Sequence, residues 1–136
     1  MSQFESLTKY ISTLQEDRIG AWVIDKENDG TAEQPIQMPY VNYSETVRRF
    51  IEDVYTFAEQ HQEMELIRYS EILLENGIEW GTNDLENVDI SNLNAQCVLA
   101  LVMGVLRAER FCEGVILAFF TNGTIVKWLE RLERLE

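Results

Sequence analysis

The chain has 136 residues, of which 46% are hydrophobic and 26% are charged, so it has the size and composition of one soluble globular domain. These values exclude an intrinsically disordered or collagen-like protein. Its 24 acids and 11 bases give a formal net charge of −13, and because such a surface repels phosphate backbones, we expect no direct binding to nucleic acid.

The amino-terminal residues predict an amphipathic helix over residues 3–16. Ser2 and Glu5 have the spacing of a capping box, in which side chains bind the free N–H groups of a helix start. Apolar residues then recur at steps of three and four: Phe4, Leu7, Ile11 and Leu14. The basic start and apolar stretch of a secretory signal are missing, so we expect a cytoplasmic protein.

Residues 17–43 predict a long irregular connection. Gly20, the pair Asp29-Gly30 and two prolines interrupt any regular pattern in this segment. Residues 21–24 and 36–38 are apolar enough to form short extended pieces within it.

Two helices are predicted between residues 44 and 77. The first is capped by Ser44 or Asn42 and runs to about Gln60, with apolar residues on one face. The second ends at Asn76-Gly77, the usual chemistry of a helix C-terminus. Residues 76–92 are rich in turn formers and predict a surface loop.

Residues 91–106 contain no charge and are apolar on every side, as expected of a helix that others surround. We therefore place a central apolar helix at about residues 92–112. A membrane span is not expected, because the fully apolar part, residues 97–106, is far shorter than the roughly 20 residues that a bilayer requires.

Asn122-Gly123 fits either a tight hairpin between two strands or the end of a helix. We favour the helix end, because the apolar residues that follow have helical spacing: Ile125, Trp128, Leu129, Leu132 and Leu135. Glu130 and Arg134 have the spacing of a favourable ion pair, and the last helix begins at Thr124. The predicted fold is all-α, a single compact domain (residues 1–136) of five or six helices.

The stretch from Leu106 to Gly114, Leu-Arg-Ala-Glu-Arg-Phe-Cys-Glu-Gly, precedes an apolar segment, Asn122-Gly123 and a leucine-rich helix. This order resembles the bacterial domain of unknown function 6508 family, chiefly over residues 91–135, with weaker similarity at Trp22 and Pro39-Tyr40. The resemblance implies a mostly helical, single-domain bacterial protein. It implies no catalytic or binding residue, because the function of the family is unknown.

Four charged residues, Arg107, Glu109, Arg110 and Glu113, follow the central helix and allow two interpretations. On a continuing helix, Arg107 would lie about 40° from Phe111 on a packing face, and the glutamates would share another edge. In the structural interpretation, both arginines favour the negative helix end, Arg110 pairs with Glu113, and Gly114 breaks the helix. In the functional interpretation, an arginine and Glu109 line a pocket mouth, where a guanidinium holds a carboxylate or phosphate.

Other catalytic and metal chemistry finds little support. Cys112 follows the arginines, but the single histidine, His61, lies on a different predicted helix, so we expect a buried structural thiol rather than a nucleophile. His61 with Glu65, and Glu109 with Glu113, have helical spacing, yet two ligands do not make a metal site. We predict no catalytic residue, no metal and no cofactor.

The leading functional hypothesis is a non-enzymatic interaction or regulatory protein with an unidentified protein partner. The first alternative is a small-molecule-binding domain or small enzyme that uses the four-residue cluster. The second is a nucleic-acid mimic that occupies a DNA-binding protein, because residues 1–90 hold 19 acids and 6 bases.

We also expect a homodimer through an apolar helical face. The apolar stripes of the first and last helices both repeat at alternating steps of three and four. The last helix is the better candidate, because it carries both signs of charge while residues 1–90 are acidic. The alternative is that the two stripes cover each other within one chain.

Overall fold

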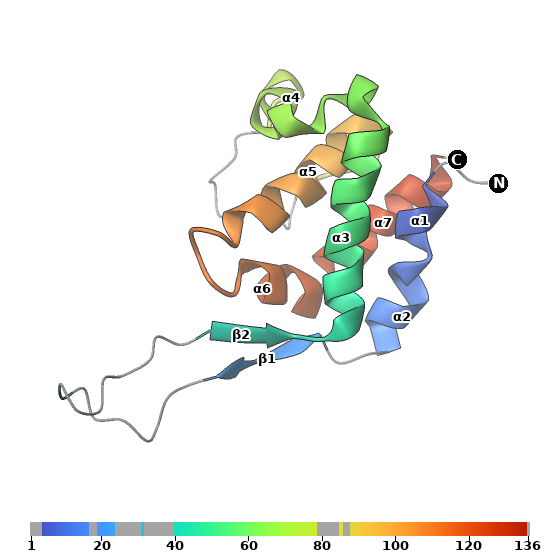
Figure 1. The fold of residues 1–136 in the computed structure, drawn as a ribbon. Helices are drawn as coiled ribbons and strands as arrows, with labels where there is room; N and C mark the ends of the chain where they lie inside the picture. Colours follow the sequence, from blue (N-terminus) through green and yellow to red (C-terminus); the bar gives the residue numbers. More distant parts are fainter. Residues whose placement is uncertain are drawn as a thin grey trace.

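Helices arranged around one buried helix make up most of the computed structural model (Figure 1), which describes residues 4–16, 19–23, 31, 40–78, 85 and 88–135. Its elements in chain order are α1 (Glu5–Thr8), α2 (Tyr10–Glu16), β1 (Gly20–Val23), β2 (Tyr40–Tyr43), α3 (Glu45–Gln60), η1 (Gln62–Met64), η2 (Leu66–Arg68), α4 (Tyr69–Glu75), α5 (Ala95–Ala108), α6 (Val115–Thr121) and α7 (Thr124–Arg134). Only Lys9 separates α1 from α2. If these two count as one helix, the described residues contain six α-helices, which confirms the predicted helical fold.

Helix α5 is the centre of the molecule. The Asn94 side chain caps it by accepting a hydrogen bond of 2.9 Å from the Cys97 N–H, and all residues from 97 to 106 are buried. Elements that precede and follow it in the sequence cover it: η2 and α4 come before α5, and α6 and α7 come after it. Among the described helices, none combines the length and apolar character of a bilayer span.

The predicted bounds of this central helix, about residues 92–112, were too wide at both ends. Residues 91–94 precede the helix, and residues 109–114 form a turn. The turn forms because the Glu109 carboxylate binds backbone N–H groups further along the chain and because Gly114 has a φ of +96°.

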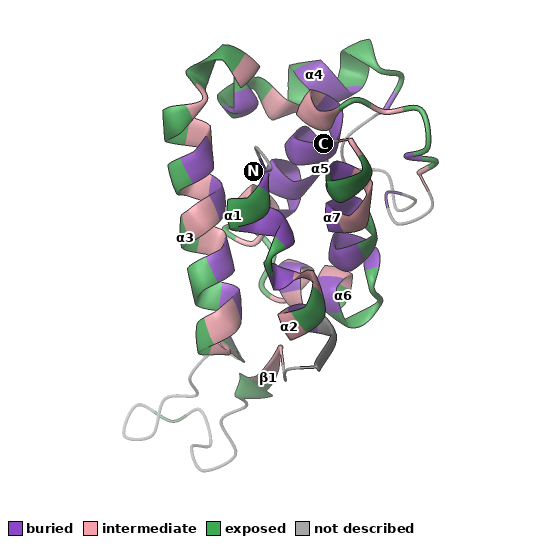
Figure 2. Ribbon diagram, turned by 90° about the vertical axis from the view of Figure 1, so that its right-hand side faces the viewer, coloured by how far each residue is buried: buried purple, intermediate pink, exposed green. Residues whose placement is uncertain are grey.

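Helix α3 is amphipathic, with a side-chain cap at its start and one buried face. Ser44 caps it, since its Oγ accepts a hydrogen bond of 3.3 Å from the Val47 N–H. Its inner face is buried and its outer face is exposed (Figure 2). Phe50 lies edge-on to two other rings, with centroids 5.5 Å from Tyr10 and 5.6 Å from Phe120, and so joins α3 to α2 and α6.

A two-stranded antiparallel hairpin joins the two ends of the segment over residues 17–43, which was expected to be an irregular connection with short extended pieces. Gly20 pairs with Tyr43 and Val23 with Tyr40, so the two ends of this segment lie side by side. The predicted extended piece at 21–24 corresponds to β1. The piece at 36–38 lies outside the described residues, and the strand that pairs with β1 is residues 40–43.

The helix ends near Asn76 and Asn122 are as predicted. Gly77 and Gly123 have φ values of +79° and +82°, and the Asn122 side chain accepts a hydrogen bond of 3.0 Å from the Thr124 N–H. Asn122-Gly123 therefore joins two helices and is not a strand hairpin. Of the predicted loop over residues 76–92, the structure describes residues 76–78, 85 and 88–92.

The apolar stripe of α7 is buried within its own chain. Ile125, Trp128 and Leu132 are 0%, 1% and 0% exposed, and α7 packs on α1, α2 and α5. The first and last helices thus cover each other, which removes the face that we had assigned to a dimer. The homodimer itself stays a prediction. The expected ion pair between Glu130 and Arg134 is not among those that the described residues form.

Candidate functional site

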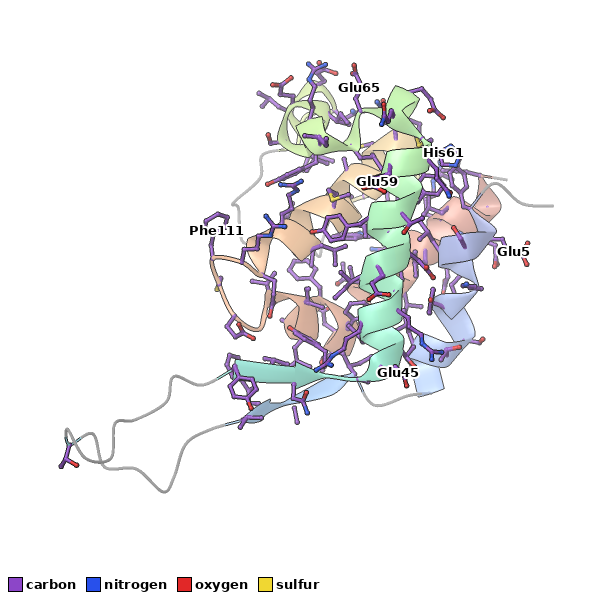
Figure 3. The ribbon with its side chains drawn as sticks, viewed as in Figure 1. Glu5, Glu45, Glu59, His61, Glu65 and Phe111 are labelled. Carbon is purple, nitrogen blue, oxygen red and sulfur yellow. The ribbon has the colours of Figure 1, made fainter. Side chains whose placement is uncertain are left out.

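The four predicted site residues lie at the end of α5 and in the turn of residues 109–114. This turn lies beside the hairpin, and Phe111 projects from it into solvent (Figure 3). The two glutamates and the two arginines do not form ion pairs with each other. The glutamates instead accept hydrogen bonds from backbone N–H groups.

Glu109 holds the turn together. Its Oε1 accepts hydrogen bonds from the N–H groups of Ile116 (2.9 Å) and Gly114 (3.1 Å). Its Oε2 accepts from the Tyr43 hydroxyl at 2.8 Å and from the Gly114 N–H at 3.1 Å. The carboxylate thus satisfies N–H groups at the start of α6 that the helix itself leaves free. Both carboxylate oxygens therefore accept hydrogen bonds from within the fold.

Tyr43 joins the hairpin to the same site. Its hydroxyl donates to Glu109 and accepts from the Leu117 N–H at 3.1 Å. Burial and the hydrogen bond to Glu109 raise the pKa of Tyr43 well above its ordinary value of 10.0. The phenol is therefore neutral over the physiological range and serves as a donor.

Two further contacts connect the hairpin with the turn. The Glu113 Oε2 accepts a hydrogen bond of 2.9 Å from the Val41 N–H. The Trp22 ring lies so close to Gly114 that a Cβ there would be 2.5 Å from the Trp22 Cζ2. Gly114 is therefore required both for its positive φ and for the space that Trp22 occupies.

Arg107 and Arg110 remain without an ion pair among the described residues. The expected pair between Arg110 and Glu113 does not form. The Nε of Arg107 is buried and has no hydrogen-bond partner there, while the Arg110 side chain is exposed. Arg107 does lie in the last turn of α5, where a cation complements the helix dipole.

Phe111 and Cys112 differ from the predictions. Phe111 is 92% exposed instead of packed, because the helix ends at Ala108 and the chain turns outward. Cys112 is exposed and is therefore not the expected buried thiol. Cys97 is the buried cysteine, and burial raises the pKa of its thiol. Both cysteines are free.

The two larger cavities that the described residues form are lined by residues outside the four-residue cluster. A cavity of about 570 Å³ is lined by residues of α2, β1, α6 and α7, with Phe120 and Val126 among its apolar walls. A second, of about 360 Å³, lies between α7 and residues 89–91. Neither lining includes Arg107, Glu109, Arg110 or Glu113.

His61 contributes to packing at the end of α3. Its ring stacks on Phe57 with centroids 4.1 Å apart, and its Nδ1 lies 3.1 Å from the Glu63 Oε1. Within the ranges that the structure describes, no three His, Cys, Asp or Glu side chains come together as metal ligands would.

Exposed acids form a line along the outer side of α3. Glu45, Glu52 and Glu59 are exposed and follow each other at steps of seven residues, so they share one side of the helix. Figure 3 shows Glu45 and Glu59 at opposite ends of α3. Arg49 interrupts this line by binding Glu45 at 2.7 Å.

A family model described as a family of unknown function, DUF6508, matches residues 1–136. The chain belongs to the DUF6508 family. The match extends over the whole chain, beyond the residues 91–135 on which the resemblance chiefly depended. No curated protein and no solved structure matches this DUF6508 chain.

Sequence reasoning missed two residues of the site in this DUF6508 protein. Trp22 and Tyr43 were not among the predicted site residues. The structure instead places Trp22 against Gly114 and Tyr43 against Glu109. The available signal was weak: a Tyr-Val-Asn-Tyr stretch with the alternation of a strand, directly before a helix cap.

Proposed function

We propose that this protein is a non-enzymatic interaction module that binds a partner protein through its Phe111 surface. This surface is defined by Arg107, Arg110, Phe111, Cys112 and Trp22. The observation that carries the proposal is a phenylalanine that is 92% exposed on a turn held by hydrogen bonds.

The backbone around Phe111 is ordered by its own contacts. The N–H groups of Phe111 and Cys112 both donate to the Ala108 carbonyl at 3.0 Å, and Glu109 fixes the far side of the turn. An apolar side chain on a fixed turn loses little conformational freedom when a partner covers it, so burial of its ring is converted efficiently into affinity. Exposed aromatic anchors of this kind are typical of binding hot spots.

The charges indicate what kind of partner fits. Arg107 and Arg110 are unpaired among the described residues of a chain whose net charge is −13. A guanidinium next to an exposed aromatic ring favours a segment that brings a carboxylate together with an apolar side chain. We therefore assign the Phe111 surface to an acidic peptide segment of another protein.

The geometry supports this function better than an enzyme built on the four-residue cluster. A general base needs a free lone pair directed at the substrate, but Glu109 accepts hydrogen bonds at both oxygens. The described cavities of about 570 and 360 Å³ are lined by other residues.

A selection from a displayed random peptide library against the full chain tests the proposal. We expect enriched peptides with Asp or Glu beside Phe, Trp or Leu. Phe111→Ser should weaken their binding at least about tenfold, and Arg110→Glu should weaken it further at low salt. Leu74→Ser is the matched control, because Leu74 is also exposed, at 64%, but lies on α4. Selected peptides that lack acids, or that bind Phe111→Ser normally, would contradict the proposal.

A second candidate function, an acidic mimic of nucleic acid, has support in the line of Glu45, Glu52 and Glu59 on α3. It is weaker, because Arg49 neutralises Glu45. A mimic would bind a basic DNA-binding protein, lose that binding on replacement of Glu52 and Glu59 by Gln, and remain unaffected by Phe111→Ser.

A further inference from the structure

Positive charge gathers in the cavity of about 360 Å³ between α7 and residues 89–91. Its lining includes three bases from one helix: Lys127, Arg131 and Arg134. The whole chain has 11 bases against 24 acids, so three bases around one hollow reverse the charge of the molecule locally. Two acids, Asp89 and Glu130, also line it.

The spacing of the three bases places them together. Steps of four and three residues along α7 keep Lys127, Arg131 and Arg134 on one side of the helix, within about 60° of each other. The other side of α7 carries Trp128 and Leu132, which are buried in the core, so the helix cannot rotate away from this arrangement.

Arg131 is held in position by a neutral group. Its Nε and Nη2 donate to the Leu93 carbonyl at 3.3 and 3.0 Å. A carbonyl fixes the guanidinium without cancelling its charge, and the remaining N–H groups stay available for a ligand. A guanidinium held in this way binds an anion with little further loss of side-chain freedom.

The other two bases lie near two acids, and the charge of Lys127 contributes, after the hydrogen bonds from Ser91, to the lowered pKa of Asp89. Lys127 and Arg134 form no ion pair among the described residues, although Glu130 precedes Arg134 by four residues. The Asp89 Oδ1 accepts hydrogen bonds from the N–H and the hydroxyl of Ser91 at 3.0 and 2.6 Å, so this one oxygen is used by its own turn.

We propose that this cavity binds a small anion that carries two or more carboxylate or phosphoryl groups. Three bases on one side of a helix match several negative groups better than one, and both groups fit the fork of a guanidinium. The volume is in the range of sites for small molecules. The site shares no residue with the Phe111 surface and stands independently of the proposed partner.

Amide chemical shifts of the nitrogen-15-labelled full chain test this site. The probes are citrate, pyrophosphate and, at matched ionic strength, sodium chloride. We expect saturable shifts at residues 89–91 and along α7 with citrate, pyrophosphate or both, and none with chloride. A response to citrate alone assigns carboxylates, and a response to pyrophosphate alone assigns phosphoryl groups.

Variants with unchanged backbone contacts decide whether the bases carry the binding. Lys127→Gln and Arg134→Gln replace exposed side chains on α7 and should each weaken the affinity about tenfold. Arg48→Gln on α3 is the matched control and should bind as the unchanged protein does. The proposal is overturned if neither anion gives saturable shifts, or if the two α7 variants bind as tightly as the control.

Discussion

The hydroxyl of Tyr43 lies 2.8 Å from a carboxylate oxygen of Glu109, although 66 residues separate the two in sequence. This bond joins the hairpin to the turn after the central helix. Since Glu109 also binds the first N–H groups of α6, one carboxylate connects three parts of the fold. The charged stretch that looks like an active site in the sequence is thus partly a structural joint.

Removal of the Tyr43 hydroxyl should loosen this joint. Tyr43→Phe deprives Glu109 of a donor and the Leu117 N–H of its acceptor, so we expect a loss of about 1–3 kcal/mol in the free energy of unfolding. Urea denaturation followed by circular dichroism measures it. Tyr40→Phe is the control, because Tyr40 is 41% exposed, and its stability should change by less than about 0.5 kcal/mol. Equal losses in the two variants would show that the bond to Glu109 contributes nothing.

Stability should fall at alkaline pH through Tyr10. Burial and the hydrogen bond from its hydroxyl to Asp53 raise the pKa of Tyr10 from 10.0 to about 12. The folded state therefore favours the neutral phenol. Its contribution is complete below pH 10, the unfolded pKa, and is lost as the pH rises towards about 12.

Urea midpoints of the unchanged chain and of Tyr10→Phe, measured from pH 8 upwards, check this window. The decline should be shallower in Tyr10→Phe, but still present, because Tyr43 also has a raised pKa. Parallel curves for the two proteins would show that Tyr10 does not contribute.

Leu101→Ala should destabilise the protein by about 2–5 kcal/mol. Leu101 is fully buried at the centre of α5, and its truncation leaves a cavity that the surrounding helices cannot fill. Leu74→Ala makes the same chemical change on α4, where the side chain is 64% exposed, and should cost less than about 0.5 kcal/mol. Thermal and urea unfolding measure both. A loss at Leu101 as small as that at Leu74 would contradict the central position of α5.

Gly114→Ala should cost more than Gly77→Ala. Both glycines have positive φ, so each substitution strains the backbone by about 1–2 kcal/mol. At Gly114 the added Cβ also meets Trp22 at 2.5 Å, whereas nothing lies within 4 Å at Gly77. We expect a further loss of about 1–3 kcal/mol at Gly114 and a shift in tryptophan fluorescence as Trp22 is displaced. Replacement of Trp22 by Ala should recover the additional loss, and no recovery would contradict the contact.

Local sequence patterns predicted the helices, because the residues that produce each pattern also determine where the helix forms and where it ends. The uncharged run at residues 97–106 must be surrounded by apolar groups, and Asn122-Gly123 ends α6 whatever packs nearby. The hairpin was less visible, since the strand at 40–43 is defined by pairing with a segment 20 residues earlier and by the bond from Val41 to Glu113.

The candidate site was predicted least well. In the sequence, helical spacing continues through Phe111, so the pattern predicted a packing face for this residue. The helix ends earlier because Glu109 finds its partners in residues that follow it, and Tyr43 comes from a strand 66 residues earlier in the chain. These bonds depend on tertiary position, which no local period encodes.

The packing of α1 and α2 on α7 also affects how the chain is made. The ribosome synthesises α1 and α2 well before α7, since over 100 residues separate Thr8 from Thr124. At roughly 5–20 residues per second, this delay is about 5–25 s. During that time the apolar side chains of Phe4, Leu7 and Leu14 lack the part of their covering surface that α7 supplies. The nascent chain thus exposes a hydrophobic helix that chaperones can bind until translation of α7 is complete.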